Sequence, residues 1–207
     1  LGFMAVVNGY EKAVEYMDTR DFTEPLFVFV ILVIAGTRPI LQAAQLLIDL
    51  LAKVIPLPGT ITYYFLTLTV VPLLGSFITE PAAMTLAAII LRDRYFSKKI
   101  PETMKYLTIA VLFVNVSIGG VLTSYAAPPV LMVASKWGWG MDFMLMTFGW
   151  KAALAVSVNA LIASWVFRKI LVGMDDLKDD YEIGRVPPLV MLIHMTTLVL
   201  VVIFSHH

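Results

Sequence analysis

A single carboxylate lies between two apolar stretches of this chain. Glu80 follows residues 61–74 and precedes residues 82–91, and neither stretch contains a charged side chain. A glutamate at bilayer depth is costly unless a proton, a cation or a basic side chain neutralises it, so its position is a candidate functional site. Together with the hydroxyl of Thr79, Glu80 predicts a site for a proton or a small cation. A capped helix start at Thr79 and Glu80 is a structural alternative that is compatible with ion binding.

Helix-breaking residues flank this carboxylate on both sides. Gly75 precedes it and Pro81 follows it directly. An opened helix exposes backbone groups, which hydrocarbon tolerates only where protein or a water-filled cavity satisfies them. The two residues therefore predict a helix break at a polar site.

A second interrupted apolar run occupies residues 103–134. It contains two pairs of helix-breaking residues, Gly119 and Gly120, then Pro128 and Pro129. Neutral oxygen donors surround these breaks: Asn115, Ser117, Thr123, Ser124 and Tyr125. Such side chains beside unwound carbonyls suit a small hard cation. A kinked helix that packs closely through its small residues explains the same pattern equally well.

A basic residue lies inside the clearest uninterrupted apolar run, residues 143–167. Lys151 follows Asp142 by nine residues, which is too deep for its ammonium group to reach water easily. We therefore expect Lys151 to face the bundle interior and a charge partner. It would act on the ion directly or neutralise Glu80, and Asn159 is a candidate for the same helix face.

The composition is that of an integral membrane protein. The chain of 207 residues is 59% hydrophobic and 14% charged, with a mean hydropathy of +0.86, which lies outside the range of ordinary soluble domains. Fifteen basic and fifteen acidic residues cancel, so the charge gives no reason to expect a nucleic-acid partner. The absence of cysteine excludes disulfides and thiolate metal sites, and we expect no cofactor and no bound metal centre.

The hydrophobic pattern predicts an all-α membrane repeat at residues 1–186, followed by the start of a further transmembrane segment at residues 187–207. The elements expected within the repeat are an interfacial lead-in at 1–22, an apolar helix from Thr23-Glu24-Pro25 to Thr37, an interfacial helix at 40–55, a hairpin at about 60–96, a discontinuous helix at about 103–135 and a span at about 143–167. The interfacial helix is predicted by a polar face of Gln42, Gln45, Asp49 and Lys53.

Two topologies are open for residues 60–96. Each arm has about 10 to 16 residues, and neither alone spans about 30 Å of hydrocarbon at about 1.5 Å per residue. The arms form either one broken spanning helix or a re-entrant hairpin. Basic residues lie after the second arm, and Lys53 lies before the first. Because basic loops tend to be cytoplasmic, this arrangement favours the hairpin.

Three long motifs together resemble the sodium/proton antiporters of the ion-transporter superfamily. They are LLGSFITEPAAMTLAA at residues 73–88, FVNVSIGGVLTSYAAPPVLMVA at 113–134 and FGWKAALAV at 148–156. The resemblance extends over essentially the whole chain. It implies two inverted repeats, each with a re-entrant hairpin and a discontinuous helix whose tips meet near the membrane midplane. By motif, the hairpin tip is 75–81 and the helix break is 115–129.

The resemblance implies cation/proton antiport in which Glu80 binds Na⁺ or a proton in turn. Neutral oxygens would come from Thr79 and from the donors around the second break, Asn115, Ser117, Thr123 and Ser124, with Lys151 as the charge partner. One hairpin and one discontinuous helix are present, so a second repeat is expected as the partner, with a homodimer as a further candidate assembly. The expected location is the lipid bilayer of a prokaryotic inner membrane.

Two alternatives are open for the function. The first is an organic-anion or oxyanion transporter of the same superfamily, although an anionic substrate fits poorly beside Glu80. The second is a structural membrane subunit of a larger complex, in which Glu80 and Lys151 only stabilise the fold.

Overall fold

The computed structural model describes most of the chain, and the described part is helical without a strand. The described residues are 2–19, 26, 29–30, 33–34, 36–56, 58–174 and 186–204. Three helical segments are long and apolar enough to cross a membrane, Gly59–Ile78, Glu102–Leu122 and Met141–Val166. The predicted all-α membrane fold is therefore confirmed. The predicted helix start at Thr23-Glu24-Pro25 lies outside the described residues.

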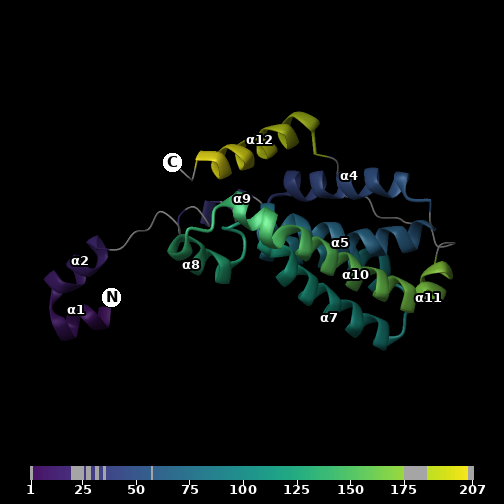
Figure 1. The fold of residues 1–207 in the computed structure, drawn as a ribbon, viewed down its shortest axis with the longest axis horizontal. Coiled ribbons are helices and arrows are strands. Elements are labelled where there is room, and N and C mark those ends of the chain that lie inside the picture. The colour runs from purple at the N-terminus through teal and green to yellow at the C-terminus, as the bar shows by residue number, and fades with distance from the viewer. Residues whose placement is uncertain are drawn as a thin grey trace.

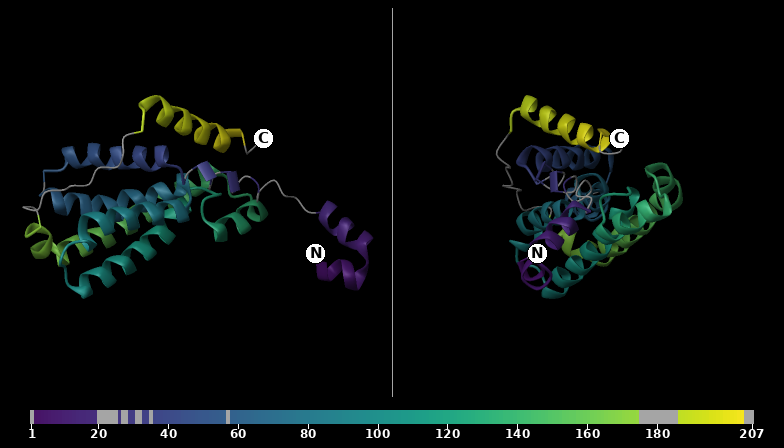
Figure 2. Two further views of the ribbon diagram at one scale, coloured as in Figure 1. Left: turned by 180° about the vertical axis from the view of Figure 1, so that it is seen from behind. Right: turned by 90° about the vertical axis from the view of Figure 1, so that its left-hand side faces the viewer.

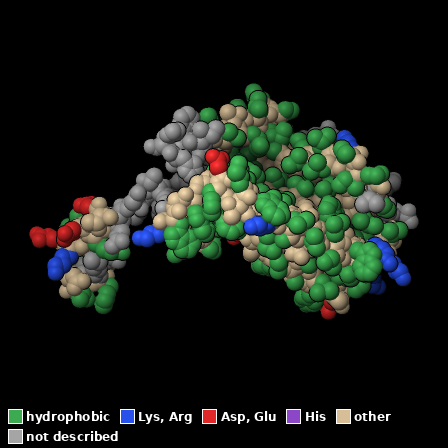
Figure 3. Space-filling model, in the orientation of Figure 1, with side chains coloured by type: hydrophobic (Ala, Val, Ile, Leu, Met, Phe, Trp, Pro, Cys, Tyr) green, Lys and Arg blue, Asp and Glu red, His purple; other side chains and the backbone are tan. Residues whose placement is uncertain are grey.

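Four helices form the bundle that carries the candidate site. They are α4 (Arg38–Val54), α5 (Gly59–Ile78), α7 (Glu102–Gly119) and α10 (Trp150–Val166). They run alongside one another in Figure 1 and in the left view of Figure 2. Hydrophobic side chains cover most of the visible face of this bundle (Figure 3), as expected for a surface that meets lipid.

The chain turns back on itself between α5 and α6 (Glu80–Leu91), which are joined by Thr79 alone. Tyr95, in the π-helix η1 (Arg92–Phe96) that follows α6, donates a hydrogen bond from its Oη to the carbonyl of Thr60 at 2.8 Å. The end of the second arm therefore lies beside the start of the first. Of the two topologies, the structure has the hairpin rather than one continuous broken helix. Its re-entrant placement in a bilayer stays a prediction.

Gly75 does not break α5, contrary to the expectation from its residue type. It lies within the helix at the point where the two arms of the hairpin approach each other. A Cβ atom on Gly75 would lie 3.1 Å from the Cβ of Ala83. The glycine therefore serves close packing of the arms, and the break falls at Thr79.

The second helix break lies where the glycines and prolines predict it. α7 ends at Gly119, a short 3₁₀-helix η2 (Gly120–Leu122) follows, and α8 (Pro128–Trp137) begins after a nonhelical stretch at 123–127. Proline is suited to the first positions of α8 because the backbone N–H that it lacks would have no helical partner there.

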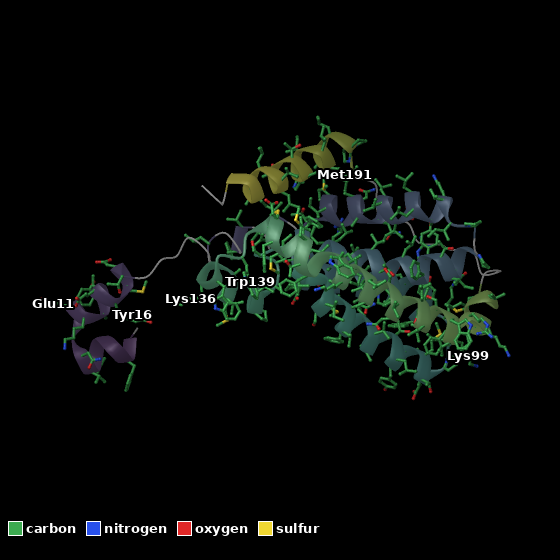
Figure 4. All side chains as sticks on the ribbon, viewed as in Figure 1. Glu11, Tyr16, Lys99, Lys136, Trp139 and Met191 are labelled. Carbon is green, nitrogen blue, oxygen red and sulfur yellow. The ribbon has the colours of Figure 1, made fainter. Side chains whose placement is uncertain are left out.

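Short helices form the first part of the third span and follow its end. α9 (Met141–Met144) and the π-helix η3 (Leu145–Gly149) precede α10, and α11 (Arg168–Val172) follows it. Trp139 packs against Phe143 and Phe148 at ring-centroid distances of 5.6 and 5.5 Å. Figure 4 shows Trp139 at one end of the bundle and Lys99 at the other. This arrangement agrees with an aromatic anchor at one membrane interface.

The side of α4 that is turned toward the protein is mainly apolar, with Ile40, Ala44 and Ile48 buried beside Gln45. Gln45 is buried and donates a hydrogen bond from Nε2 to Asp49 Oδ1 at 3.2 Å, while Gln42 Oε1 accepts one from the backbone N–H of Val186 at 2.8 Å. Leucines on the opposite side, including Leu46 and Leu50, are exposed. α4 is therefore two-faced, but not along the predicted division: Ile48 is buried with Gln45, and Lys53 of the predicted polar face is exposed. The placement of α4 at a membrane interface stays a prediction.

The other described helices are α1 (Gly2–Asn8), α2 (Tyr10–Asp18) and α12 (Pro188–Phe204). α1 and α2 lie apart from the bundle (Figures 1 and 2). α12 packs against α4.

Candidate functional site

The hairpin tip is joined to the break after α7 by hydrogen bonds of one serine. Ser76 donates from Oγ to the carbonyl of Gly119 at 2.5 Å, and the same oxygen accepts a hydrogen bond from the backbone N–H of Leu122 at 2.9 Å. Thr123 donates from Oγ1 to the Ser76 carbonyl at 2.6 Å. Ser76 and Thr123 are fully buried. These bonds satisfy backbone groups that the two helix breaks leave without helical partners.

Two glycines allow the tip and the break to touch. A Cβ atom on Gly119 would lie 2.6 Å from the carbonyl carbon of Pro72, so α7 meets the backbone of α5 directly. A Cβ atom on Gly120 would lie 2.9 Å from Cγ and 3.0 Å from Cδ of Glu80. The carboxylate of Glu80 therefore lies against the backbone where α7 ends.

The helix ends around Glu80 make this position suited to a cation or a proton. Glu80 is half-buried and is the first residue of α6, whose amino-terminal dipole favours its negative charge. α5 and α7 both end nearby, at Ile78 and Gly119, and their last carbonyls carry partial negative charge. A carboxylate beside two carboxyl-terminal helix ends is an environment that attracts positive charge.

Thr79 combines backbone strain with a buried hydroxyl. Its φ and ψ are 79° and 149°, in a region that is essentially restricted to glycine and costs a β-branched residue on the order of 1–3 kcal/mol. Its side chain is 3% exposed, and its Oγ1 has no hydrogen-bond partner within the described part of the chain. The tip thus holds a buried oxygen next to Glu80 that is available to a ligand.

Asn115 supports the site from one helical turn before the break. Pro72 lies inside α5 and has no N–H for the Leu68 carbonyl, four residues earlier. Asn115 Nδ2 donates to that carbonyl at 2.8 Å and to the Val156 carbonyl at 3.2 Å. Its Oδ1 accepts a hydrogen bond from Asn159 Nδ2 at 3.0 Å. Asn115, predicted as an ion ligand, therefore joins α5, α7 and α10 through its amide group.

The structure separates two predicted site residues from this group. Ser117 is exposed on the side of α7 opposite to Asn115, and Lys151 is exposed on α10. The Lys151 Nζ lies 5.6 Å from the ring centroid of Trp150, and it forms no ion pair with Glu80 in the described structure. The expectation that Lys151 faces the bundle interior does not hold here, because Ala152, Val156 and Ala160 form the buried side of α10.

The remaining predicted residues lie at the breaks themselves. Ser124 is buried in the stretch between η2 and α8, and Pro81, Pro128 and Pro129 lie at the starts of α6 and α8. Ser76 was not predicted as a site residue. A hydroxyl residue within the predicted hairpin tip at 75–81 is the sequence feature that would have indicated it.

One of three comparisons with known proteins finds a match for the chain. A family model with the description "Putative Na+/H+ antiporter" matches residues 1–207. No curated protein and no solved structure matches the chain.

Proposed function

The chain belongs to this Na⁺/H⁺ antiporter family, which consists of transporters rather than enzymes, and we propose that Glu80 is the carboxylate at which Na⁺ and H⁺ exchange. The observation that carries the proposal is the contact of the Glu80 side chain with Gly120, where the hairpin tip and the break after α7 meet. A proton and Na⁺ each neutralise one carboxylate charge, so binding of one displaces the other. This competition couples the two ion movements.

The neutral ligands of the proposed site come from the same two breaks. Thr79 Oγ1 is buried beside Glu80 without a hydrogen-bond partner in the described residues, and Ser124 is buried in the second break. Oxygen ligands of this kind are those that hard cations prefer. Ser76 and Thr123 hold the two breaks together, and Asn115 anchors them to the bundle.

We further propose that a second repeat completes the site. The described residues contain one hairpin, α5–α6, and one discontinuous helix, α7–α8, and both present their broken ends to each other. In transporters built from inverted repeats, binding sites lie where corresponding broken helices of the two repeats face each other. An organic anion is a weaker candidate substrate, since Glu80 and the carboxyl-terminal ends of α5 and α7 would repel it.

Exchange in proteoliposomes tests the function. The full-length transporter is reconstituted with a pH-sensitive dye inside, and a Na⁺ gradient is imposed without any permeant organic anion. Inward Na⁺ is expected to drive proton efflux, and protein-free liposomes show the background leak. Proton movement that requires an organic anion and is indifferent to Na⁺ would replace the proposed function by the anion alternative.

Substitutions of Thr79 test its hydroxyl as a ligand. Thr79→Val keeps the branched shape and removes the oxygen, so the Na⁺ concentration for half-maximal exchange is expected to rise about tenfold, which corresponds to about 1.4 kcal/mol of lost binding. Thr79→Ser keeps the oxygen and is expected to stay within about twofold of the unmodified protein. Equal Na⁺ dependence of the valine and serine variants would remove Thr79 from the ligand set.

A further inference from the structure

The exposed side of α10 carries a cation at one end of an apolar surface. Lys151 shares this side with Leu154, Val158 and Ile162, which are 58%, 43% and 56% exposed. At 3.6 residues per turn, Lys151, Val158 and Ile162 lie within a narrow angular sector of the helix. We call these four residues the Lys151 face.

The ammonium group of Lys151 is far from both ends of its span. The span covers Met141–Val166, so Lys151 lies about 15 Å from its start and about 22 Å from its end at about 1.5 Å per residue. The hydrocarbon core is about 30 Å thick, which places Lys151 near its middle. A lysine at this depth costs roughly 2.5–3.5 kcal/mol on insertion scales, and such residues normally pair with an opposite charge.

The described structure provides no carboxylate for Lys151. Its polar contact is with the ring of Trp150, at 5.6 Å from Nζ to the centroid. Glu80 lies against Gly120 and forms no ion pair with Lys151 in the described part of the chain. A cation–π contact at this distance contributes on the order of 0.5–1 kcal/mol, which is less than the cost of the unpaired charge.

A groove that shares Ile162 with the Lys151 face and continues toward the end of α10 adds a second polar feature. It lies between α7 and α10, has a volume of about 330 Å³ and is lined mainly by apolar side chains, among them Leu107, Val114, Ile162 and Val166. Asn159 is the polar side chain on its wall and already donates its Nδ2 to Asn115. Asparagine side chains at the surfaces of membrane helices promote helix association through hydrogen bonds between helices.

We propose that the Lys151 face and this groove form the docking surface for a membrane-spanning helix from outside residues 1–207, and that this helix carries an Asp or Glu opposite Lys151. The apolar lining provides packing, and the carboxylate neutralises the lysine at mid-depth. The proposal needs no assumption about which ion is transported.

Charge argues against two simpler occupants. Within the three described spans, the acidic residues are Glu102, at the first position of its span, and Asp142, at the second position of its span. Glu80 lies outside these spans, and its side chain contacts Gly120 within the same copy. The three described spans of a second copy therefore present no carboxylate from their middle. Lipid acyl chains carry no charge, and lipid phosphates lie at the interface, beyond the reach of a lysine at the middle of the hydrocarbon.

Site-specific photo-cross-linking in native membranes tests the proposed contact. A benzoylphenylalanine replaces Val158 in the full-length transporter, and Phe113, which is exposed on the side of α7 away from the groove, is the control position. Val158 lies two helical turns from Lys151 on α10. We therefore expect Val158 to cross-link to a membrane-spanning peptide at a residue about two helical turns from an Asp or Glu, at several times the yield of Phe113. Products that contain only lipid, or a second copy of residues 1–207, would overturn the proposal.

Charge reversal tests the role of Lys151 itself. Lys151→Glu is expected to lower the Val158 cross-link yield at least about tenfold, and Lys151→Arg to preserve it. Lys169→Glu, at an exposed position in α11 outside the spans, is the matched control and is expected to change nothing. Exchange of the partner carboxylate for lysine should restore the yield in the Lys151→Glu protein. An unchanged yield in Lys151→Glu, or the absence of restoration, would rule out the ion pair.

Discussion

Glu80→Gln is expected to abolish sodium-driven proton movement, with a loss of exchange rate on the order of 100-fold or more. Glutamine has nearly the same shape as glutamate, so the contact with Gly120 is retained. It cannot bind and release a proton at neutral pH, and it provides no negative charge for Na⁺. The proteoliposome assay with the pH-sensitive dye measures the loss of proton binding and the loss of Na⁺ binding together, because both stop sodium-driven proton movement.

A matched substitution separates this effect from a general loss of charge. Glu102 is exposed at the start of α7, and Glu102→Gln is expected to exchange at the rate of the unmodified protein. In the unmodified protein, a higher external pH should also reduce the Na⁺ concentration needed for half-maximal exchange, since fewer protons compete for the carboxylate. Sodium-driven proton movement that persists in Glu80→Gln would show that another group exchanges the ions.

Gly119→Ala is expected to destabilise the fold by about 1–3 kcal/mol, the usual cost of overpacking a close contact. The new Cβ would meet the carbonyl carbon of Pro72 at 2.6 Å. That atom belongs to the backbone, so α7 must move away from α5 and strain the hydrogen bond from Ser76 to the residue-119 carbonyl. Thermal unfolding in detergent should show a lower midpoint temperature.

Two other glycines provide the controls for this substitution. Gly140 has φ −69° and no atom within 4 Å of an added Cβ, so Gly140→Ala should leave the midpoint temperature unchanged. Gly120→Ala meets the flexible side chain of Glu80, so it should displace the carboxylate and impair exchange more than it lowers stability. An equal midpoint for Gly119→Ala and Gly140→Ala would show that α5 and α7 are not in close contact at this position.

Local sequence features were sufficient to predict the elements of the fold. The break after α7 lies where Gly119 and Gly120 predict it, and α8 begins at Pro128, because these residues act on the backbone at their own positions. The membrane class follows from composition, and the spans Glu102–Leu122 and Met141–Val166 follow from the length of apolar runs. The first arm of the hairpin is longer than predicted, because α5 has 20 residues and is long enough to cross a membrane, whereas an arm of about 10 to 16 residues was expected. The association of Glu80 with a helix start also depends only on its neighbours Thr79 and Pro81.

The contacts of the site depended on tertiary structure, because they join residues that are far apart in the chain. Ser76 bonds Gly119 over 43 residues, and Asn115 bonds Leu68 over 47, so no local pattern indicates either pairing. The sequence also could not determine on which side of α10 the Lys151 side chain lies. An apolar membrane helix has no polar face to indicate its buried side, so the packing of Ala152, Val156 and Ala160 placed Lys151 on the outside of α10.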